Sequence, residues 1–381
     1  MANNRIYYAT HQVGLKADGD AGDFTEVHGA QSVGMTTNFN LEQVFELGQL
    51  AIYENIEGTP DVSVDLQKVL DGYPPIFLLA TVGATYPTLA SRSTQKCVFG
   101  LSIFSDELEY ATGAAPSVVE CSGMYINSVS YTFPVEGNFT EDVSLVGNNK
   151  VWANDSRIIN PNIGTPTFDG AFTGTDSPIG LGGVNRRENI LFEYDAGEGL
   201  DTLGRVADYD ATILPVEVHG ITTSGTNEQT DGQKYDAHIQ SISVSFDLGR
   251  EDLNELGKRT PYYRAPTYPI EVTCAIETIS TSGDMVSGTE EGILTTGTGA
   301  CDDAGNLSDN TIRIATCEGT RIYLGLRNKL SSVSYTGGDA GGGNVATTYN
   351  YTNFNICTVM HSGDPNTNFT WSNRATYLRD V

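Results

Sequence analysis

Residues 236–278, DAHIQSISVSFDLGREDLNELGKRTPYYRAPTYPIEVTCAIET, carry the pattern that decides the fold. Small polar and apolar side chains alternate along 239–246 and again along 270–276, as expected for two strands that each bury one face. Between them, acidic residues precede 253–256 and Gly257 follows, which predicts a single helical turn with a glycine stop. The stretch is therefore predicted to form a strand, a short polar turn, a charged loop and a second strand.

The same plan occurs earlier in the chain, at residues 33–66, VGMTTNFNLEQVFELGQLAIYENIEGTPDVSVDL. Phe39 takes the place of Phe246, and the Glu-Leu-Gly triplet at 46–48 takes the place of the triplet at 255–257. Two flanking motifs recur in the same order, namely EVHG at 26–29 and 217–220, and NSVSYT at 127–132 with SSVSYT at 331–336. These anchors predict a tandem duplication, with shared strand composition as the alternative explanation.

The length of 381 residues exceeds what one hydrophobic core usually serves, so two domains are expected. We predict a mainly β chain with two split-β-barrel or β-sandwich modules, each with a short helix. In the first module the proline-led apolar run at 73–81 is the predicted helix. A loop-rich segment without periodic apolar runs separates the modules. The predicted boundaries are 1–152 for the first module, 153–210 for the connector and 211–381 for the second module.

The chain is strongly acidic, with a formal net charge of −27 from 48 acidic and 21 basic side chains. Such a chain repels a phosphate backbone and gains little from counterion release, which argues against tight binding of nucleic acid. The sequence has no run of 18 apolar residues, and its first residues lack the charged and apolar regions of a signal peptide. We therefore expect no membrane partner and no export signal.

The reactive side chains form no catalytic or metal-binding pattern. The six cysteines contain no CxxC pair and the five histidines contain no HxxxH pair, so neither a zinc framework nor a histidine-activated nucleophile is indicated. Without an export signal, the cysteines are expected to be buried free thiols. P-loop, GxSxG and Rossmann motifs are also absent. We expect no cofactor, no metal and no enzymatic activity.

The order of strand, Glu-Leu-Gly turn, charged loop, proline-led strand and buried helix resembles the tail tube proteins of tailed bacteriophages. In that family, single modules assemble as stacked six-membered rings around a continuous inner barrel. The resemblance therefore implies two split-barrel tube modules in this chain. Because one chain would supply two modules, we expect a trimeric ring with pseudo-sixfold symmetry. Six copies with one module per ring layer are the alternative.

The resemblance also implies a function, a location and partners. It implies a structural virion protein, made in the host cytoplasm, whose stacked rings form the tail tube, an acidic channel for DNA. The implied partners are the chain itself, sheath or terminator proteins, baseplate proteins and genomic DNA as a transiting cargo. The alternatives are another tail component, such as a distal tail or baseplate ring, and a β-rich carbohydrate-binding adhesin.

Two sets of residues are candidates for these roles. Basic side chains gather at 250–264 in a chain with few of them, and we expect the loops at 46–58 and 255–267 to contact other subunits or modules. The contact candidates are Arg250, Lys258, Arg259, Arg264, Glu46, Tyr53, Arg186 and Arg187. Small polar side chains on one strand face are expected to line the channel. The lumen candidates are Thr37, Ser128, Ser130, Ser243, Ser245, Ser332, Ser334 and Asp247.

Overall fold

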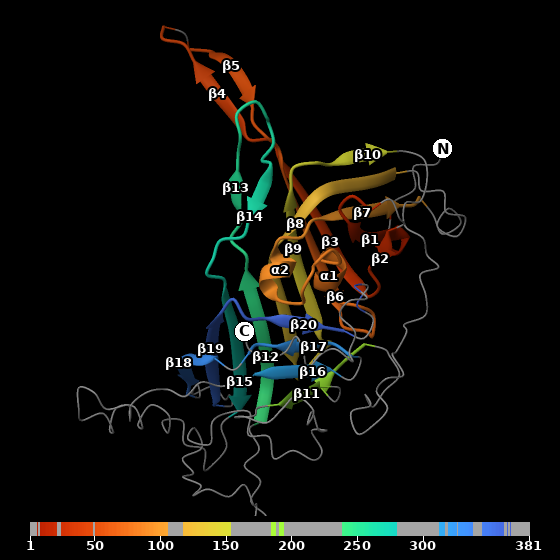
Figure 1. Cartoon of the computed structure of the whole chain (residues 1–381), viewed down its shortest axis with the longest axis vertical. Coiled ribbons are helices and arrows are strands. Elements are labelled where there is room, and N and C mark those ends of the chain that lie inside the picture. The colour runs from red at the N-terminus through yellow and green to blue at the C-terminus, as the bar shows by residue number, and fades with distance from the viewer. Residues whose placement is uncertain are drawn as a thin grey trace, which may run out of the picture.

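The fold is taken from a computed structural model of the chain (Figure 1). The structure describes residues 6, 8–20, 24–48, 50–105, 117–153, 184–187, 190–193, 238–279, 312–316, 319–325, 327–337, 345–361, 364 and 366. Most of the predicted connector, the EVHG motif at 217–220, Cys301 and Cys317 lie outside these residues.

Residues 238–279 include two long antiparallel strands, β12 (His238–Asp247) and β15 (Glu271–Ile279). The residues between them form a hairpin of β13 (Glu251–Leu253) and β14 (Tyr263–Ala265). The predicted helical turn at 253–256 is therefore wrong. Gly257 has a φ of +89°, which an L side chain rarely adopts, and the chain reverses there as a turn instead of continuing into a helix.

The N-terminal half has the same arrangement. Strands β3 (Ala30–Asn38) and β6 (Asp61–Val69) pair antiparallel, and a hairpin of β4 (Leu41–Phe45) and β5 (Ile52–Glu57) connects them. We call this hairpin, residues 39–60, the arm. Gly48 reverses the chain near its tip with a φ of +94°.

The four long strands β3, β6, β12 and β15 belong to one long antiparallel array. Four more elements complete it: β8 (Ser117–Pro134), β9 (Thr140–Gly147), β18 (Lys329–Thr336) and β19 (Ala346–Phe354). The pairings give the order β3-β6-β9-β8-β12-β15-β19-β18. The prediction of a mainly β chain is confirmed. β8 joins the two halves because its C-terminal part pairs with both β9 and β12.

The remaining elements surround this array. The N-terminal part of β8 pairs with β7 (Cys97–Ile103) and β10 (Val151–Ala153), and β7 continues to β1 (His11–Ala17) and β2 (Thr25–Glu26). A second sheet contains β11 (Ile190–Glu193), β16 (Arg313–Thr316), β17 (Arg321–Tyr323) and β20 (Thr358–Met360). The helices are η1 (Tyr8–Thr10), α1 (Ile76–Ala80) and α2 (Leu89–Ser93). Helix α1 confirms the prediction at 73–81, whereas α2 was not predicted.

Apolar side chains from both halves form one buried cluster, which includes Val64, Val129 and Val244. Helix α1 lies on this packed side, where the ring of Phe77 meets the ring of Phe246 edge-on at 5.6 Å between centroids. The buried carboxylate of Glu141 accepts hydrogen bonds from the first backbone amides of α1, 2.5 Å from Ile76 and 3.0 Å from Phe77. The helix start thus uses a carboxylate from β9 to satisfy amides that have no partner within the helix.

The strand registers show how closely the two halves correspond. β3 and β12 have a register shift at the same place, between Ala30 and Ser32 and between Ile239 and Ser241. β8 and β18 share a second one, between Ile126 and Ser128 and between Leu330 and Ser332. Aligning these shifts places Asn40 on Gly249, and both residues have a positive φ, of 47° and 49°. The tandem duplication itself stays a prediction.

One sequence anchor of that prediction is wrong. The registers place Phe39 opposite Leu248 in the alignment of the two halves, two residues beyond Phe246. Phe39 lies after the end of β3 and is 62% exposed, whereas Phe246 lies within β12 and is 3% exposed. Phe39 and Phe246 were matched only because both are phenylalanines near a strand end. A period-two pattern looks the same after a shift of two residues, so it did not reveal the mismatch.

Candidate functional site

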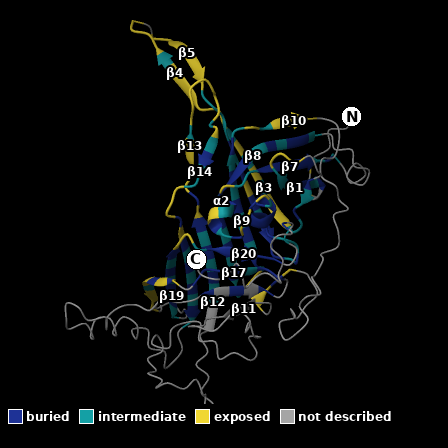
Figure 2. Cartoon of the chain, in the orientation of Figure 1, coloured by how far each residue is buried: buried dark blue, intermediate teal, exposed yellow. Residues whose placement is uncertain are grey.

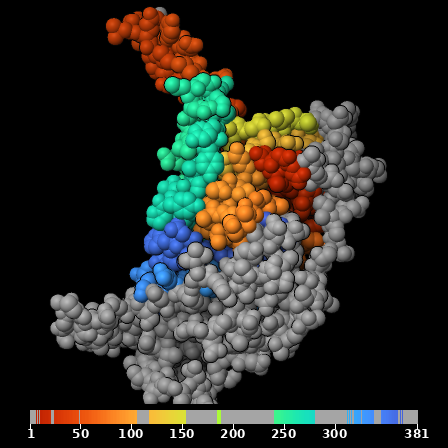
Figure 3. Space-filling view, in the orientation of Figure 1, coloured from red at the N-terminus to blue at the C-terminus, as the bar shows by residue number. Residues whose placement is uncertain are grey.

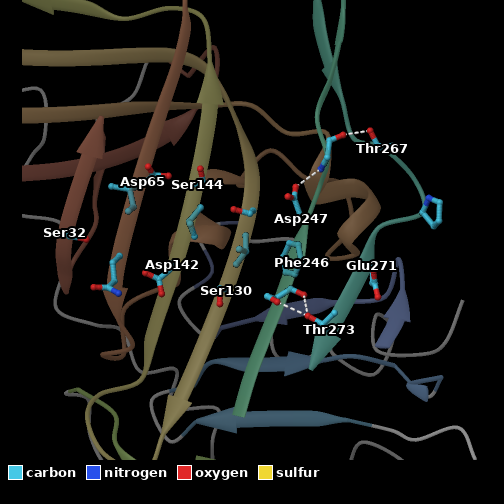
Figure 4. Close-up of a pocket in the computed structure, with 18 residues that line it drawn as sticks. Ser32, Asp65, Ser130, Asp142, Ser144, Phe246, Asp247, Thr267, Glu271 and Thr273 are labelled. Carbon is cyan, nitrogen blue, oxygen red and sulfur yellow. Dashed lines mark hydrogen bonds between the residues drawn. The ribbon is translucent and has the colours of Figure 1, made fainter. Parts of the chain in front are cut away.

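The face of the array opposite the helices bears a polar groove of about 740 Å³ (Figure 4). Its lining comes from β3, β6, β9, β8, β12 and β15, so it runs across the junction between the two halves. Seven hydroxyl side chains and four carboxylates dominate the lining, and the described lining residues include no lysine or arginine. The hydroxyl and carboxylate residues are Ser32, Ser128, Ser130, Ser144, Ser245, Thr267, Thr273, Asp65, Asp142, Asp247 and Glu271.

Hydrogen bonds between neighbouring strands hold part of this lining in place. The hydroxyls of Ser245 and Thr273 lie 2.8 Å apart across β12 and β15. At the end of β12, the backbone amide of Gly249 donates to the carboxylate of Asp247 at 2.8 Å, and the hydroxyl of Thr267 donates to the carbonyl of Gly249. The described part of the groove therefore presents fixed acceptors and no cationic side chain, a surface that repels phosphate groups.

Most lumen candidates lie on the polar face. Ser128, Ser130, Ser245 and Asp247 line the groove itself, and Ser243 shares their face of β12 by alternation. Ser332 and Ser334 lie on β18, opposite Asn350 and Thr348.

Thr37 does not belong to this set. It pairs with the buried Val62 and therefore lies on the packed face of β3, where its hydroxyl accepts a hydrogen bond from the Lys150 ammonium group at 3.2 Å. As with Phe39, residue type alone was misleading. Two adjacent threonines at 36–37 do not show which of them lies on the polar face of the strand.

Sequence reasoning placed Asp142 close to the channel but missed two other carboxylates of the groove, Asp65 and Glu271. A signal was present for Asp65, because the alternation in DVSVDL at 61–66 places it on the face opposite Val62, Val64 and Leu66. Glu271 needed the pairing of the strands, which brings separate carboxylates to one surface.

The arm is the second candidate site. Figures 1 and 3 show it projecting beyond the rest of the described structure, and Figure 2 shows its surface largely exposed. Leu47 and Leu50 near its tip are fully exposed, at 104% and 106%. Six more large apolar or aromatic side chains of the arm are exposed, namely Phe39, Leu41, Phe45, Ile52, Tyr53 and Ile56. An apolar surface of this kind commonly marks a protein contact.

Two of the contact candidates join the second hairpin, residues 248–270, to the base of the arm. The Arg259 guanidinium donates to the backbone carbonyls of Glu57 at 3.2 Å and Gly58 at 2.8 Å. The Arg264 guanidinium lies 2.6 Å from the Asp61 carboxylate and 3.1 Å from that of Asp252. Both arginines thus have partners within the chain.

The other contact candidates lie in three different surroundings. Arg250 donates to the carbonyl of Ile126 at 2.7 Å, and burial lowers the pKa of its guanidinium to about 10. Lys258 forms an exposed ion pair with Glu255. Glu46 and Tyr53 are exposed on the arm, and Arg186 and Arg187 are exposed beside the first half, with Arg186 3.2 Å from Asn138.

Reactive groups are sparse in the part of the chain that the structure describes. Within it, no three His, Cys, Asp or Glu side chains are grouped to hold a metal ion. The four described cysteines are buried free thiols, and burial raises the pKa of Cys97, Cys274 and Cys357 to about 12. No described helix combines the length and apolar character needed to cross a bilayer.

Comparisons with known proteins give structural matches only. No family model matches the chain, and no curated protein matches it. A chain of the anti-feeding prophage baseplate is 12% identical, with a TM-score of 0.31, over 40% of this chain and 98% of that one. A chain of the sheath-tube complex of an extracellular contractile injection system is 11% identical, with a TM-score of 0.30, over 40% and 94%. A chain of a gene transfer agent virion is 11% identical, with a TM-score of 0.23, over 32% and 85%.

Proposed function

We propose that this protein is a structural component of a phage tail that polymerises into stacked rings and forms the tail tube. The observation that carries the proposal is the array of eight strands, whose polar groove has no lysine or arginine among its described lining residues and whose two end strands each have one edge without a described partner strand. Such an array hides its edges by joining other copies into a closed barrel. The resemblance of the sequence to tail tube proteins names the class of assembly.

The ring is a trimer with pseudo-sixfold symmetry. Each chain contributes two sets of four strands in the same order, β3-β6-β9-β8 and β12-β15-β19-β18, which fits a tandem duplication of one ring module. Three copies then supply six modules to one layer. A stable monomer, or a ring of six whole chains, in mass measurement or averaged images would contradict this stoichiometry.

The polar groove faces the bore of the tube. Hydroxyls make the surface hydrophilic, and carboxylates such as Asp142 and Asp247 repel the phosphates of a passing duplex. Because the described lining residues include no lysine or arginine, DNA finds no ion pair with them and moves without being held. The protein thus acts without catalysis, cofactor or metal, as the wall of a channel.

Negative-stain imaging of the purified protein at increasing concentration tests the proposal. We expect hollow rods built of stacked rings. Single rings that do not stack would favour a distal tail or baseplate component. Particles that stay small and bind glycans on an array would favour the adhesin, although Phe246, the one aromatic ring among the described lining residues, is 3% exposed.

A further inference from the structure

We propose that β18 of one copy pairs antiparallel with β3 of a second copy, in the register that β8 and β12 have within the chain. This inference rests on the proposed function and specifies its subunit interface. In the part of the chain that the structure describes, β3 pairs only with β6 and β18 only with β19, so each offers one free edge. The two edges end the same array, and they correspond to β12 and β8, which already pair with each other.

The shared register shifts fix which residues would meet. They align Ser128 with Ser332 and Ser241 with Ser32. Within the chain, Tyr131 is opposite Val244 and Ser130 is opposite Ser245. The same register between copies places Tyr335 opposite Met35, and Ser334 opposite Thr36.

A comparison of side-chain burial at the β8–β12 junction and at the free edges of β18 and β3 supports a second copy of the chain as the partner at those edges. At the internal junction Tyr131 and Val244 are both 0% exposed. Their counterparts are uncovered in a single chain, where Tyr335 is 54% exposed and Met35 is half-buried against the core. A β3 edge from a second copy supplies the apolar neighbour that Val244 provides to Tyr131, and it leaves no unpaired strand.

The exposure of the arm follows from the same repeat. The second hairpin contacts the base of the arm, which belongs to the preceding half of the array. In this contact the Arg259 guanidinium donates a hydrogen bond to the carbonyl of Gly58. The arm is the counterpart of that hairpin. It belongs to the first half of the array, so its own chain has no preceding half for it to contact. Across the interface it would lean on residues 267–271 of the second copy. There Leu50, the counterpart of Arg259, meets Tyr268, the counterpart of Gly58, and these side chains are 106% and 48% exposed in one chain.

Disulfide trapping in the full chain tests the register. Met35→Cys with Tyr335→Cys places two thiols opposite each other, and mild oxidation should convert the chain into covalent oligomers that end at the ring size. The matched control is Met35→Cys with Val333→Cys, on the same faces but two residues out of register and beyond disulfide reach. We expect severalfold less cross-linked product from the control and from the unsubstituted chain, which measures the background from native cysteines.

Three outcomes would overturn the inference. These are equal cross-linking of the shifted pair, dimers from either single-cysteine variant (which would indicate β3 with β3 or β18 with β18), and no cross-linking in rods that form normally. Thr36→Cys with Ser334→Cys repeats the test on the exposed face, in case the first pair prevents folding. Rods without cross-links would contradict the β18–β3 interface but remain consistent with the tube function. Cross-linked closed oligomers that never stack would support the interface and contradict the tube function.

Discussion

At the scale of residues, two arginines of the second hairpin differ in how far the fold depends on them. The side chain of Arg264 is 9% exposed between Asp61 and Asp252, whereas that of Arg259 is 60% exposed. Arg264→Glu would place three carboxylates together, so we expect it to lower the free energy of unfolding by about 1–3 kcal/mol. Arg259→Glu should change it by less than about 0.5 kcal/mol. Denaturant unfolding of both variants measures the difference, and equal losses would contradict the assignment.

Glu141 gives the fold a pH dependence. Burial raises the pKa of its carboxyl group, although the amides of Ile76 and Phe77, the Tyr131 hydroxyl and the nearby Lys68 favour the charged form. The folded chain therefore binds this proton more tightly than the unfolded chain. As pH rises from the ordinary carboxyl range through the raised pKa, this group's contribution to the free energy of unfolding is lost.

The variant Glu141→Gln isolates that contribution because it has no proton to release. We expect the free energy of unfolding of the wild-type chain, relative to the variant, to fall as pH rises through this window. Urea unfolding of both chains at several pH values between about 4 and 8 provides the measurement. A difference that stays constant, or that grows with pH, would show that burial does not control this carboxyl group.

At the scale of elements, the proposed assembly predicts that the arm matters more for polymerisation than for folding. Its leucines at 47 and 50 touch too little of their own chain to stabilise it, since both are fully exposed. We expect Leu47→Ser with Leu50→Ser to change the free energy of unfolding by less than about 0.5 kcal/mol and to abolish rods. Leu47→Met with Leu50→Met keeps the apolar surface and should still give rods. Normal rods from the serine variant would remove the arm from the interface.

At the scale of the whole molecule, the proposed channel function predicts that the charge of the groove controls contact with DNA. Asp142→Lys with Asp247→Lys puts cations into the polar groove, so we expect rods of this variant to retain DNA that wild-type rods release. Two phosphate contacts per site would weaken the binding about tenfold between about 50 and 200 mM salt.

A co-sedimentation assay of assembled rods with duplex DNA measures the retention. Asp18→Lys with Asp20→Lys makes the same change in net charge outside the groove and serves as the control. Equal retention by the two variants would mean that net charge alone, and not the groove, governs contact with DNA.

The sequence alone predicted the long strands, because period-two alternation depends only on neighbouring residues. It predicted β12, β15, β8 and helix α1, and it identified the serines of the polar face. Only the pairing of Thr37 with Val62 in the folded chain shows which face of β3 Thr37 lies on. Likewise, only the folded chain shows that a hairpin turn at Gly257 takes the place of the predicted helical turn. Tertiary structure also gathered Asp65, Asp142 and Glu271 on one surface, because strand pairing joins residues that local sequence patterns cannot connect.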